Sequence, residues 1–193
     1  MSNQNMLFPV FLKIEQLNTV IIGGGNVGLE KLQALLKNSP EAQVTLIGTQ
    51  ILDEIKLLAT KNKSIKVMEK PFQKRDLKGA QILIVATDNH RLNEDIARYA
   101  GERGILTNVA DTPALCDFYL GSTVTKGSLK IGISTNGLSP TFAKRFRQVL
   151  EDILPEETQE LLLNLNHIRN KLKTSFTEKV KRLNEHTKSL VHD

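Results

Sequence analysis

Cysteine is nearly absent from this chain of 193 residues, in which Cys116 is the only one. A single cysteine excludes a disulfide within the chain and any metal site built from a cluster of cysteines. Long apolar runs are also absent, because no window approaches the roughly 18 apolar residues that a membrane-spanning helix needs. Pro9 interrupts the apolar stretch near the N-terminus and no basic segment precedes it, so we expect no secretory signal, no membrane partner and a cytoplasmic location.

Aromatic side chains make up only 5% of the chain, and they are not interleaved with basic residues as in proteins that bind single-stranded nucleic acid. The formal net charge is +5, but the basic side chains are scattered. Those in residues 56–78, for example, are spread over a predicted helix, strand and loop. We interpret them as a solvated face, with a site for an anionic small molecule as the alternative, and we expect no nucleic-acid partner.

Short runs rich in Val, Ile and Leu alternate with segments whose apolar residues recur at helical spacing. The runs lie at 19–22, 43–47, 65–68, 81–86 and 105–109. The helical segments lie at 27–38, 50–62 and 89–103. Strands that alternate with helices are joined by right-handed crossovers into a parallel sheet that is covered on both faces. The sequence therefore predicts an α/β fold with a Rossmann-type, doubly wound sheet.

The apolar positions of two helical segments predict which of their faces is buried. In the first segment the buried stripe consists of Val27, Leu32, Leu35 and Leu36. In the last segment it consists of Leu92, Ile96, Tyr99 and Ala100. Asp88 or Asn89 is the expected N-cap of that last helix.

Three glycines separate the first strand from the first helix in the motif Gly23-x-Gly25-x-x-Gly28. In this setting they permit a tight turn, a close approach of the backbone to a pyrophosphate, and close packing of helix on sheet. The helix N-terminus at Asn26 and Val27 offers unpaired N–H groups and a partial positive charge to phosphates. We therefore predict a dinucleotide site here, and a purely structural turn is the alternative.

The end of the second strand lacks the residue that usually binds the ribose. Thr49 and Gln50 occupy the place where an NAD site offers Asp or Glu to the ribose hydroxyls. No Arg is present there for a 2′-phosphate either. We expect NAD rather than NADP, with both residues in the cofactor site, although no carboxylate on this strand selects it.

The alternation of strands and helices stops after the fifth strand. Residues 117–135 contain two β runs joined at Lys126–Gly127, which indicates a hairpin. Ser139 and Pro140 then provide an N-cap and a first helical residue, and Pro155 ends that helix. Beyond it, apolar residues recur at spacings typical of one or two amphipathic helices, which we expect to pack on the fold or on a second subunit.

Four segments occur in an order that resembles one family: the glycine loop, ATD at 86–88, NVAD at 108–111 and STNGLSP at 134–140. Together they are similar to the precorrin-2 dehydrogenase and sirohydrochlorin ferrochelatase family, the corresponding module of sirohaem synthesis. The resemblance covers nearly the whole chain. It implies an enzyme that oxidises precorrin-2 to sirohydrochlorin with NAD⁺ and that in some members inserts Fe²⁺ to give sirohaem.

The resemblance also implies a domain organisation and a homodimer. It places an NAD-binding Rossmann domain at 1–112, a dimerisation region of hairpin plus helix at 113–150, and a helical C-terminal domain at 151–193. We expect no fused methyltransferase, because 193 residues leave no room for one.

Asp111 is the candidate catalytic residue. It follows the fifth strand, on the carboxyl edge where open α/β sheets bind ligands. By resemblance it matches the family's catalytic aspartate, which would accept a proton from the macrocycle in both steps. A turn-forming role before Thr112–Pro113 is the alternative. Asp88 is a rival acid, and with Thr87 we expect it to shape the cofactor loop and cap the next helix.

The substrate-binding candidates follow the hairpin. The resemblance places Ser134, Thr135 and Asn136 near the tetrapyrrole, although a plain turn explains them as well. Basic residues of the next helix are candidates for holding substrate carboxylates, with a solvated helix surface as the alternative. These basic residues are Lys144, Arg145 and Arg147.

We expect no metal site made by the protein. The four histidines lack ligand-like spacing, and the tetrapyrrole itself supplies four nitrogen ligands. Cys116 is expected to be a small buried hydrophobe without a catalytic role. Whether the chain also inserts iron stays open, because the same aspartate would serve both the oxidation and the insertion. Whether the metal is Fe²⁺ or Co²⁺ stays open as well.

Two other classes of function stay open. A nucleotide-sensing regulatory module also combines a Rossmann domain with a dimerising tail, but it needs no aspartate at the sheet edge. A dehydrogenase of another small molecule would share the glycine loop and usually show a catalytic Lys, Tyr or His. Neither class accounts for the NVAD and STNGLSP segments together.

Overall fold

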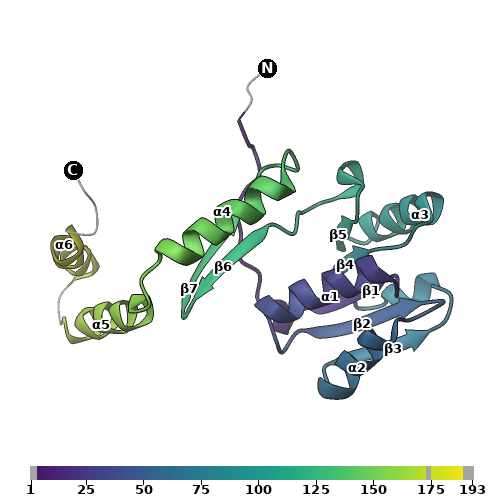
Figure 1. Ribbon diagram of the computed structural model, residues 1–193, viewed down its shortest axis with the longest axis horizontal. Coiled ribbons are helices and arrows are strands. Elements are labelled where there is room, and N and C mark those ends of the chain that lie inside the picture. Colours follow the sequence, from purple (N-terminus) through teal and green to yellow (C-terminus); the bar gives the residue numbers. More distant parts are fainter. Residues whose placement is uncertain (1–3, 173–174, 189–193) are drawn as a thin grey trace. The chain divides into compact units, whose positions relative to one another are not determined.

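The computed structural model describes residues 4–172 and 175–188 (Figure 1). They form two compact units. The sheet unit is Phe8–Leu120, and the hairpin unit joins Met1–Leu7 to Gly121–Asp193. Residues 113–120 cluster with the sheet unit, and the predicted domain bounds stay predictions. The predicted dimerisation and C-terminal domains stay predictions.

The sheet unit is a five-stranded parallel sheet with the order β3-β2-β1-β4-β5. The predicted Rossmann-type fold is thus confirmed, with each predicted strand and helix present within a few residues. Its elements are β1 (Asn18–Ile22), α1 (Asn26–Asn38), β2 (Gln43–Gly48), α2 (Asp53–Lys61), β3 (Ile65–Glu69), β4 (Ile82–Val85), α3 (His90–Gly101) and β5 (Leu106–Val109), with short 3-10 turns η1 (Ile14–Gln16), η2 (Lys74–Leu77) and η3 (Pro113–Leu115).

Helices cover both faces of the sheet because successive strand residues point to opposite sides. Val20 and Ile22 of β1 pack in one buried cluster with Ile96 of α3. Ile21, between them, packs in a second cluster with Leu32 of α1 and with α2. Burying each such side chain stabilises the fold by about 1.5–3 kcal/mol. The chain leaves β1 on one face and β4 on the other, so a crevice opens between the two strands at their carboxyl ends.

The hairpin unit contains an antiparallel pair, β6 (Ser122–Lys126) and β7 (Leu129–Ile133), and α4 (Pro140–Ile153) beside it (Figure 1). Gly127 has a φ of 56°, which suits the two-residue turn predicted at that point. The predicted N-cap is confirmed as well, because the Ser139 hydroxyl accepts the N–H of Phe142 at 3.1 Å. Two further helices follow, α5 (Thr158–Lys171) and α6 (Phe176–Thr187).

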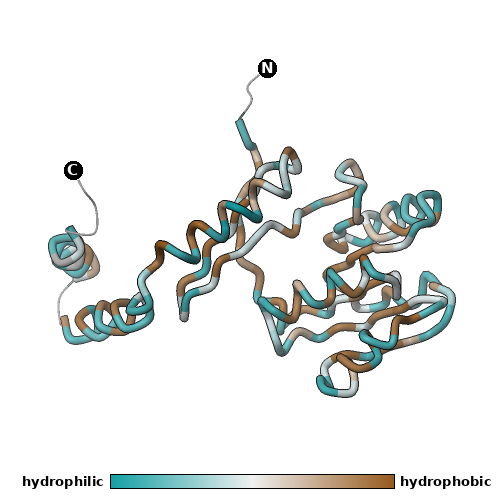
Figure 2. Tube along the Cα trace, in the orientation of Figure 1, coloured by the Kyte–Doolittle hydropathy of each residue, from teal (hydrophilic) through white to brown (hydrophobic). Residues whose placement is uncertain are grey.

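Hydropathy differs between the two units. Nearly all buried apolar side chains belong to the sheet unit, whereas the described part of the hairpin unit buries only Val124 and Ala143. Figure 2 shows hydrophobic and hydrophilic segments alternating along α4. Within the described ranges, no helix combines the length and the apolar character needed to cross a bilayer.

Candidate functional site

Backbone hydrogen bonds at the carboxyl edge of the sheet align three turns. The N–H of Gly23 donates to Ile47 at 2.8 Å, and the N–H of Ala86 donates to Ile22 at 2.7 Å. The N–H of Ala110 donates to Val85 at 2.8 Å. The ladder therefore continues one residue past each strand, so the glycine loop, the ATD turn and the NVAD turn begin side by side.

These turns surround a cleft of about 950 Å³ within the sheet unit. Its volume is within the range of small-molecule and cofactor sites. Its lining includes Asp111 and every predicted cofactor residue except Gly28, namely Gly23, Gly25, Asn26, Val27, Thr49, Gln50, Thr87 and Asp88. The structure thus brings them together, and their roles in binding stay predictions.

The glycines of the motif differ in what surrounds them. Gly23 has a φ of 122°, and a Cβ there would lie 2.2 Å from the carbonyl oxygen of Ala86. A Cβ on Gly28 would lie 2.0 Å from the carbonyl oxygen of Gly23, so this glycine allows α1 to approach the loop. A Cβ on Gly25 would meet nothing within 4 Å. Packing requires Gly23 and Gly28, whereas Gly25 faces open space at the cleft.

The N-terminus of α1 is free of a side-chain cap. Its N-cap is Gly25, and the first helical hydrogen bond runs from the N–H of Leu29 to the carbonyl of Gly25 at 2.9 Å. Amide groups and the positive end of the helix dipole therefore face the cleft without an acidic residue in the first turn. This arrangement fits the pyrophosphate of a dinucleotide.

Two further glycines were missed from the sequence. A Cβ on Gly24 would lie 2.2 Å from the carbonyl oxygen of Gln50, and one on Gly48 would lie 2.8 Å from the N of Gly24. The N–H of Leu52 also donates to Gly24 at 3.0 Å. These contacts join the glycine loop to the turn after β2. The sequence did offer one sign of this contact, because a glycine ends β2 and three consecutive glycines follow the neighbouring strand β1.

Asn93 is a second residue that the sequence did not single out. It is 2% exposed, and its Nδ2 donates to the backbone oxygen of Thr87 at 2.9 Å, while its Oδ1 accepts from the Thr87 hydroxyl. Asn93 thus fixes the ATD turn by bonding both the side-chain hydroxyl and the backbone carbonyl of Thr87. The N-cap of α3 is Asn89, whose Oδ1 accepts the N–H of Leu92 at 3.0 Å. Asp88 is not the cap; it is exposed at the cleft.

The predicted buried stripes were correct for Leu32, Leu35, Ile96 and Ala100 but wrong for two positions. Val27 and Leu92 are each 36% exposed and line the cleft, as does Phe72 from the turn after β3. Both lie in the first turn of their helices, where a helix emerges beyond the sheet edge and its apolar face meets the cleft instead of the core. They provide apolar surface of the kind that base and nicotinamide rings contact.

Asp111 is held in an uncommon backbone conformation. Its φ is 55°, in the left-handed region, and its side chain is exposed at the cleft. Asp tolerates this region better than most residues, at a cost of about 1–3 kcal/mol. The surrounding turn is closed by a hydrogen bond of 3.3 Å from Thr112 to Val109.

Cys116 supports this turn from behind. Its Sγ accepts the N–H of Val109 at 3.2 Å, and it lies within donating distance of the carbonyls of Val109 at 3.2 Å and Thr112 at 3.4 Å. Burial raises the pKa of the thiol, so it keeps its proton at neutral pH. Cys116 is partly buried, as a hydrophobe would be, but it acts as a polar anchor on both sides of Asp111.

The neighbouring residues continue this support along β5. Asp117 accepts the N–H of Thr107 at 2.9 Å and returns its own N–H to the Thr107 carbonyl at 2.8 Å. The Asn108 amide donates to the carbonyl of Phe118 at 2.9 Å. Side chains therefore satisfy the outer edge of β5, and Asn108 of the NVAD motif has a structural role.

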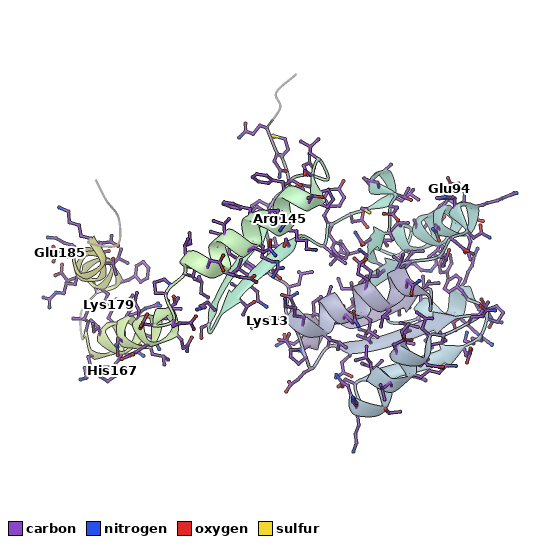
Figure 3. The ribbon with its side chains drawn as sticks, viewed as in Figure 1. Lys13, Glu94, Arg145, His167, Lys179 and Glu185 are labelled. Carbon is purple, nitrogen blue, oxygen red and sulfur yellow. The ribbon has the colours of Figure 1, made fainter. Side chains whose placement is uncertain are left out.

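The predicted substrate residues lie in the hairpin unit. The Ser134 hydroxyl accepts the N–H of Asn136 at 3.2 Å, and the Thr135 hydroxyl accepts the N–H of Ser139 at 3.2 Å, so both organise the turn before α4. Asn136 has a φ of 52°. Lys144 and Arg145 are exposed on α4, where Figure 3 labels Arg145. Their role toward a substrate stays a prediction.

Metal ligands are not grouped in the part of the chain that the structure describes: no three His, Cys, Asp or Glu side chains there are placed to hold an ion.

A family profile described as "Putative NAD(P)-binding" matches residues 10–122, which include the whole cleft. The chain belongs to this NAD(P)-binding family. A second profile, described as "Sirohaem biosynthesis protein central", matches residues 126–153, the hairpin and α4. The two matches fall on the two units, and they confirm the resemblance to the sirohaem-synthesis family that the motifs indicated.

Curated proteins similar to this NAD(P)-binding chain are named siroheme synthases. Siroheme synthase of Ruthia magnifica subsp. Calyptogena magnifica is 34% identical over 88% of this chain, and that of Pseudoalteromonas atlantica is 31% identical over 91%. The chain spans only 35% and 37% of their lengths. The solved structure of SirC, precorrin-2 dehydrogenase, has the same fold, with a TM-score of 0.71 at 22% identity over 93% of this chain and 88% of that one.

Proposed function

We propose that this chain oxidises precorrin-2 to sirohydrochlorin with NAD⁺, a step of sirohaem biosynthesis. The observation that carries the proposal is the shared cleft of the glycine loop and Asp111, at the carboxyl edge of one sheet. A dinucleotide cleft with a carboxylate at its mouth is what a dehydrogenase needs. The names of the siroheme synthases and of SirC supply the substrate class.

The residues of the cleft fit NAD. Open space at Gly25 and the uncapped start of α1 accommodate the pyrophosphate, while Thr49 and Gln50 border the position of the adenosine ribose. Val27, Leu92 and Phe72 supply apolar wall. Bound NAD⁺ supplies the hydride acceptor.

Asp111 is the proposed base. Oxidation of precorrin-2 removes one hydride and one proton, and the carboxylate of Asp111 would accept the proton while a bound dinucleotide would supply the hydride acceptor. Exposure at the cleft and the left-handed turn leave this carboxylate free of the sheet ladder. Asp88, which is exposed in the same cleft, is the next candidate.

Insertion of Fe²⁺ into sirohydrochlorin is the finer part of the proposal. Metal insertion displaces two pyrrole protons, and Asp111 would accept them one after the other, releasing the first to water before it takes the second. Fe²⁺ is here a substrate that the macrocycle binds. Ser134, Thr135, Asn136, Lys144 and Arg145 are proposed to contact the tetrapyrrole and its carboxylates.

A homodimer and a cytoplasmic location belong to the same proposal. Four apolar residues of α4 are exposed, namely Phe142 at 59%, Phe146 at 42%, Val149 at 50% and Ile153 at 65%. A two-stranded hairpin with one helix buries too little to be stable without further cover. A second copy of the chain provides such cover.

The experiment is a spectrum. Precorrin-2 and the purified chain are mixed with NAD⁺, and absorbance is followed as the macrocycle gains conjugation and NADH forms, with and without Fe²⁺. We expect oxidation that requires NAD⁺, followed by a further spectral change when Fe²⁺ is added. A chain that binds NAD⁺ but leaves precorrin-2 unchanged would contradict the proposed reaction.

A further inference from the structure

The residue that usually selects NAD or NADP does not explain the choice of cofactor in this cleft. In Rossmann sites the residue at the end of the second strand makes this choice: an acid binds the ribose 2′-hydroxyl, or an Arg accommodates the 2′-phosphate. Here Thr49 and Gln50 at the end of β2 are neither. A charged group near this position has to come from another element.

Glu69 is that group. It is the last residue of β3 and pairs in register with Gly48, the last residue of β2, so both lie at the same carboxyl edge. Its Oε1 accepts the N–H of Ile51 at 3.2 Å, and Ile51 lines the cleft directly after Gln50. The carboxylate of β3 therefore reaches across to the turn in which an acid of β2 usually stands.

Glu69 forms an ion pair with a nearby lysine. Its Oε2 lies 3.0 Å from the ammonium of Lys56 on α2. The hydrogen bond from Lys56, followed by that from the Ile51 N–H, lowers the pKa of Glu69 below its usual value. Lys70, the next residue, is paired with Asp76. Lys56 and Lys70 are thus each paired with a carboxylate.

Two further acids follow the turn after β2. Asp53 and Glu54 occupy the first turn of α2, where they oppose the positive end of its dipole. A 2′-phosphate placed after β2 would meet the Ile51 N–H already bonded to a carboxylate, and a Lys56 already paired with that carboxylate.

We propose that Glu69 makes this cleft select NAD⁺ over NADP⁺. It repels the 2′-phosphate, occupies the backbone N–H of Ile51 that a phosphate oxygen would use, and neutralises Lys56. The inference rests on the part of the proposed function that assigns a nicotinamide dinucleotide to the cleft. It does not depend on the identity of the substrate that is oxidised.

The test is calorimetric binding of NAD⁺ and NADP⁺ to Glu69→Gln. Glutamine keeps an acceptor for the Ile51 N–H but removes the charge and frees Lys56. Both side chains are nearly half exposed, at 47% for Glu69 and 43% for Lys56, so solvent screens them and the effect is moderate. We expect NADP⁺ to bind about tenfold more tightly than to the wild type, and NAD⁺ affinity to change by less than about threefold.

Glu41→Gln is the matched control. Glu41 is exposed and precedes β2 at the opposite edge of the sheet, so its loss changes the net charge equally. Equal tightening of NADP⁺ in both variants, or no tightening in a folded Glu69→Gln, overturns the proposal. Lys56→Met is a second variant that keeps the Glu69 charge, and tighter NADP⁺ binding in it also overturns the proposal.

The outcomes separate this proposal from the proposed function. If the wild-type chain binds NAD⁺ and Glu69→Gln still rejects NADP⁺, the result contradicts only the role proposed for Glu69 and leaves the cofactor assignment in place. A wild-type chain that binds neither dinucleotide contradicts the cofactor assignment and, with it, this proposal.

Discussion

At the scale of single residues, Gly25 offers a test of the phosphate site that leaves the fold intact. Its φ of −87° and ψ of −166° are open to any residue, and its Cβ position is empty. Asp is a favourable N-cap, better than Gly by roughly a few tenths of a kcal/mol, but its carboxylate would occupy the amides that we assign to the pyrophosphate. We expect Gly25→Asp to keep its melting temperature and to lose NAD⁺ binding in calorimetry.

The control for this variant is Gly101→Asp. Gly101 ends α3, and a Cβ there also meets nothing within 4 Å, so the same charge is added at an equally open glycine outside the cleft. Gly101→Asp should bind NAD⁺ like the wild type. Unchanged NAD⁺ affinity in folded Gly25→Asp would rule out the glycine loop as the phosphate site.

Asp111 carries the chemistry at the same scale. Asn adopts left-handed φ values as readily as Asp, so Asp111→Asn should keep the turn while removing the base. General-base contributions are about 10²- to 10⁴-fold, so the rate of precorrin-2 oxidation should fall by at least roughly 100-fold. NAD⁺ affinity should barely change, and any metal insertion should fall in the same variant.

Asp88→Asn is the matched comparison for this experiment. Asp88 is an exposed carboxylate in the same cleft. It is the last residue of the ATD turn, which Asn93 supports through Thr87, and Asn89 caps the helix that follows. We expect at most a small loss of rate. Oxidation at nearly the wild-type rate by Asp111→Asn, together with a large loss in Asp88→Asn, would transfer the role of base to Asp88.

At the scale of elements, Cys116 connects the end of β5 to the turn that displays Asp111. In Cys116→Ala the Val109 N–H loses its partner, which costs about 1–3 kcal/mol if water does not replace the thiol. We expect a lower free energy of unfolding in urea and a lower kcat, because the left-handed turn is no longer held. NAD⁺ affinity should stay close to that of the wild type, since the glycine loop is separate.

Cys116→Ser separates anchoring from packing in this experiment. Serine retains a donor and an acceptor at the same position, so it should recover more of kcat than alanine does. If both variants lose stability equally while kcat is unchanged, the thiol only packs and does not position Asp111.

The sequence was sufficient for elements whose signal is local. Short runs of Val, Ile and Leu located the strands of the sheet, helical spacing located its helices, and Ser139 with Pro140 marked the start of α4. The sequence did not predict burial correctly where the position of a helix relative to the sheet determines it. Val27 and Leu92 look like core residues in a helical pattern, yet they lie in first turns that extend past the sheet into the cleft. Nothing local distinguishes them from Leu32 and Ile96.

The candidate site was predictable in part for the same reason. The glycine loop and Asp111 follow strands directly, so sheet topology alone brings them to one edge. Asn93, Cys116 and Glu69 act through contacts with residues that are 6, 7 and 18 positions away in sequence, which no short motif encodes. Supporting residues of this kind are visible only after the turns are placed in space.

At the scale of the whole molecule, the two units differ in how well they bury apolar residues. The sheet unit has two buried clusters, one on each face of its sheet. In the hairpin unit, the described residues leave a continuous apolar face on α4 exposed, and it includes a stacked pair of rings, Phe142 and Phe146, with centroids 5.9 Å apart. An exposed face of this kind marks an interaction surface.

A second copy of the chain is the partner that we expect on this face. Val149 is half exposed on α4, at 50%, so Val149→Glu adds a charge there without disturbing a core. Light scattering at micromolar concentration should report a dimer for the wild type and a shift toward monomer for this variant. NAD⁺ affinity, a property of the sheet unit, should be retained.

Thr141→Glu is the control for the dimer experiment, because Thr141 is exposed in the first turn of the same helix, where an added acid favours the helix dipole. It adds the same charge away from the face that Phe142, Phe146 and Val149 share at helical spacing, so the dimer should persist. A wild-type monomer would contradict the homodimer itself. A dimer that survives Val149→Glu would instead place the contact between the two copies elsewhere on the chain.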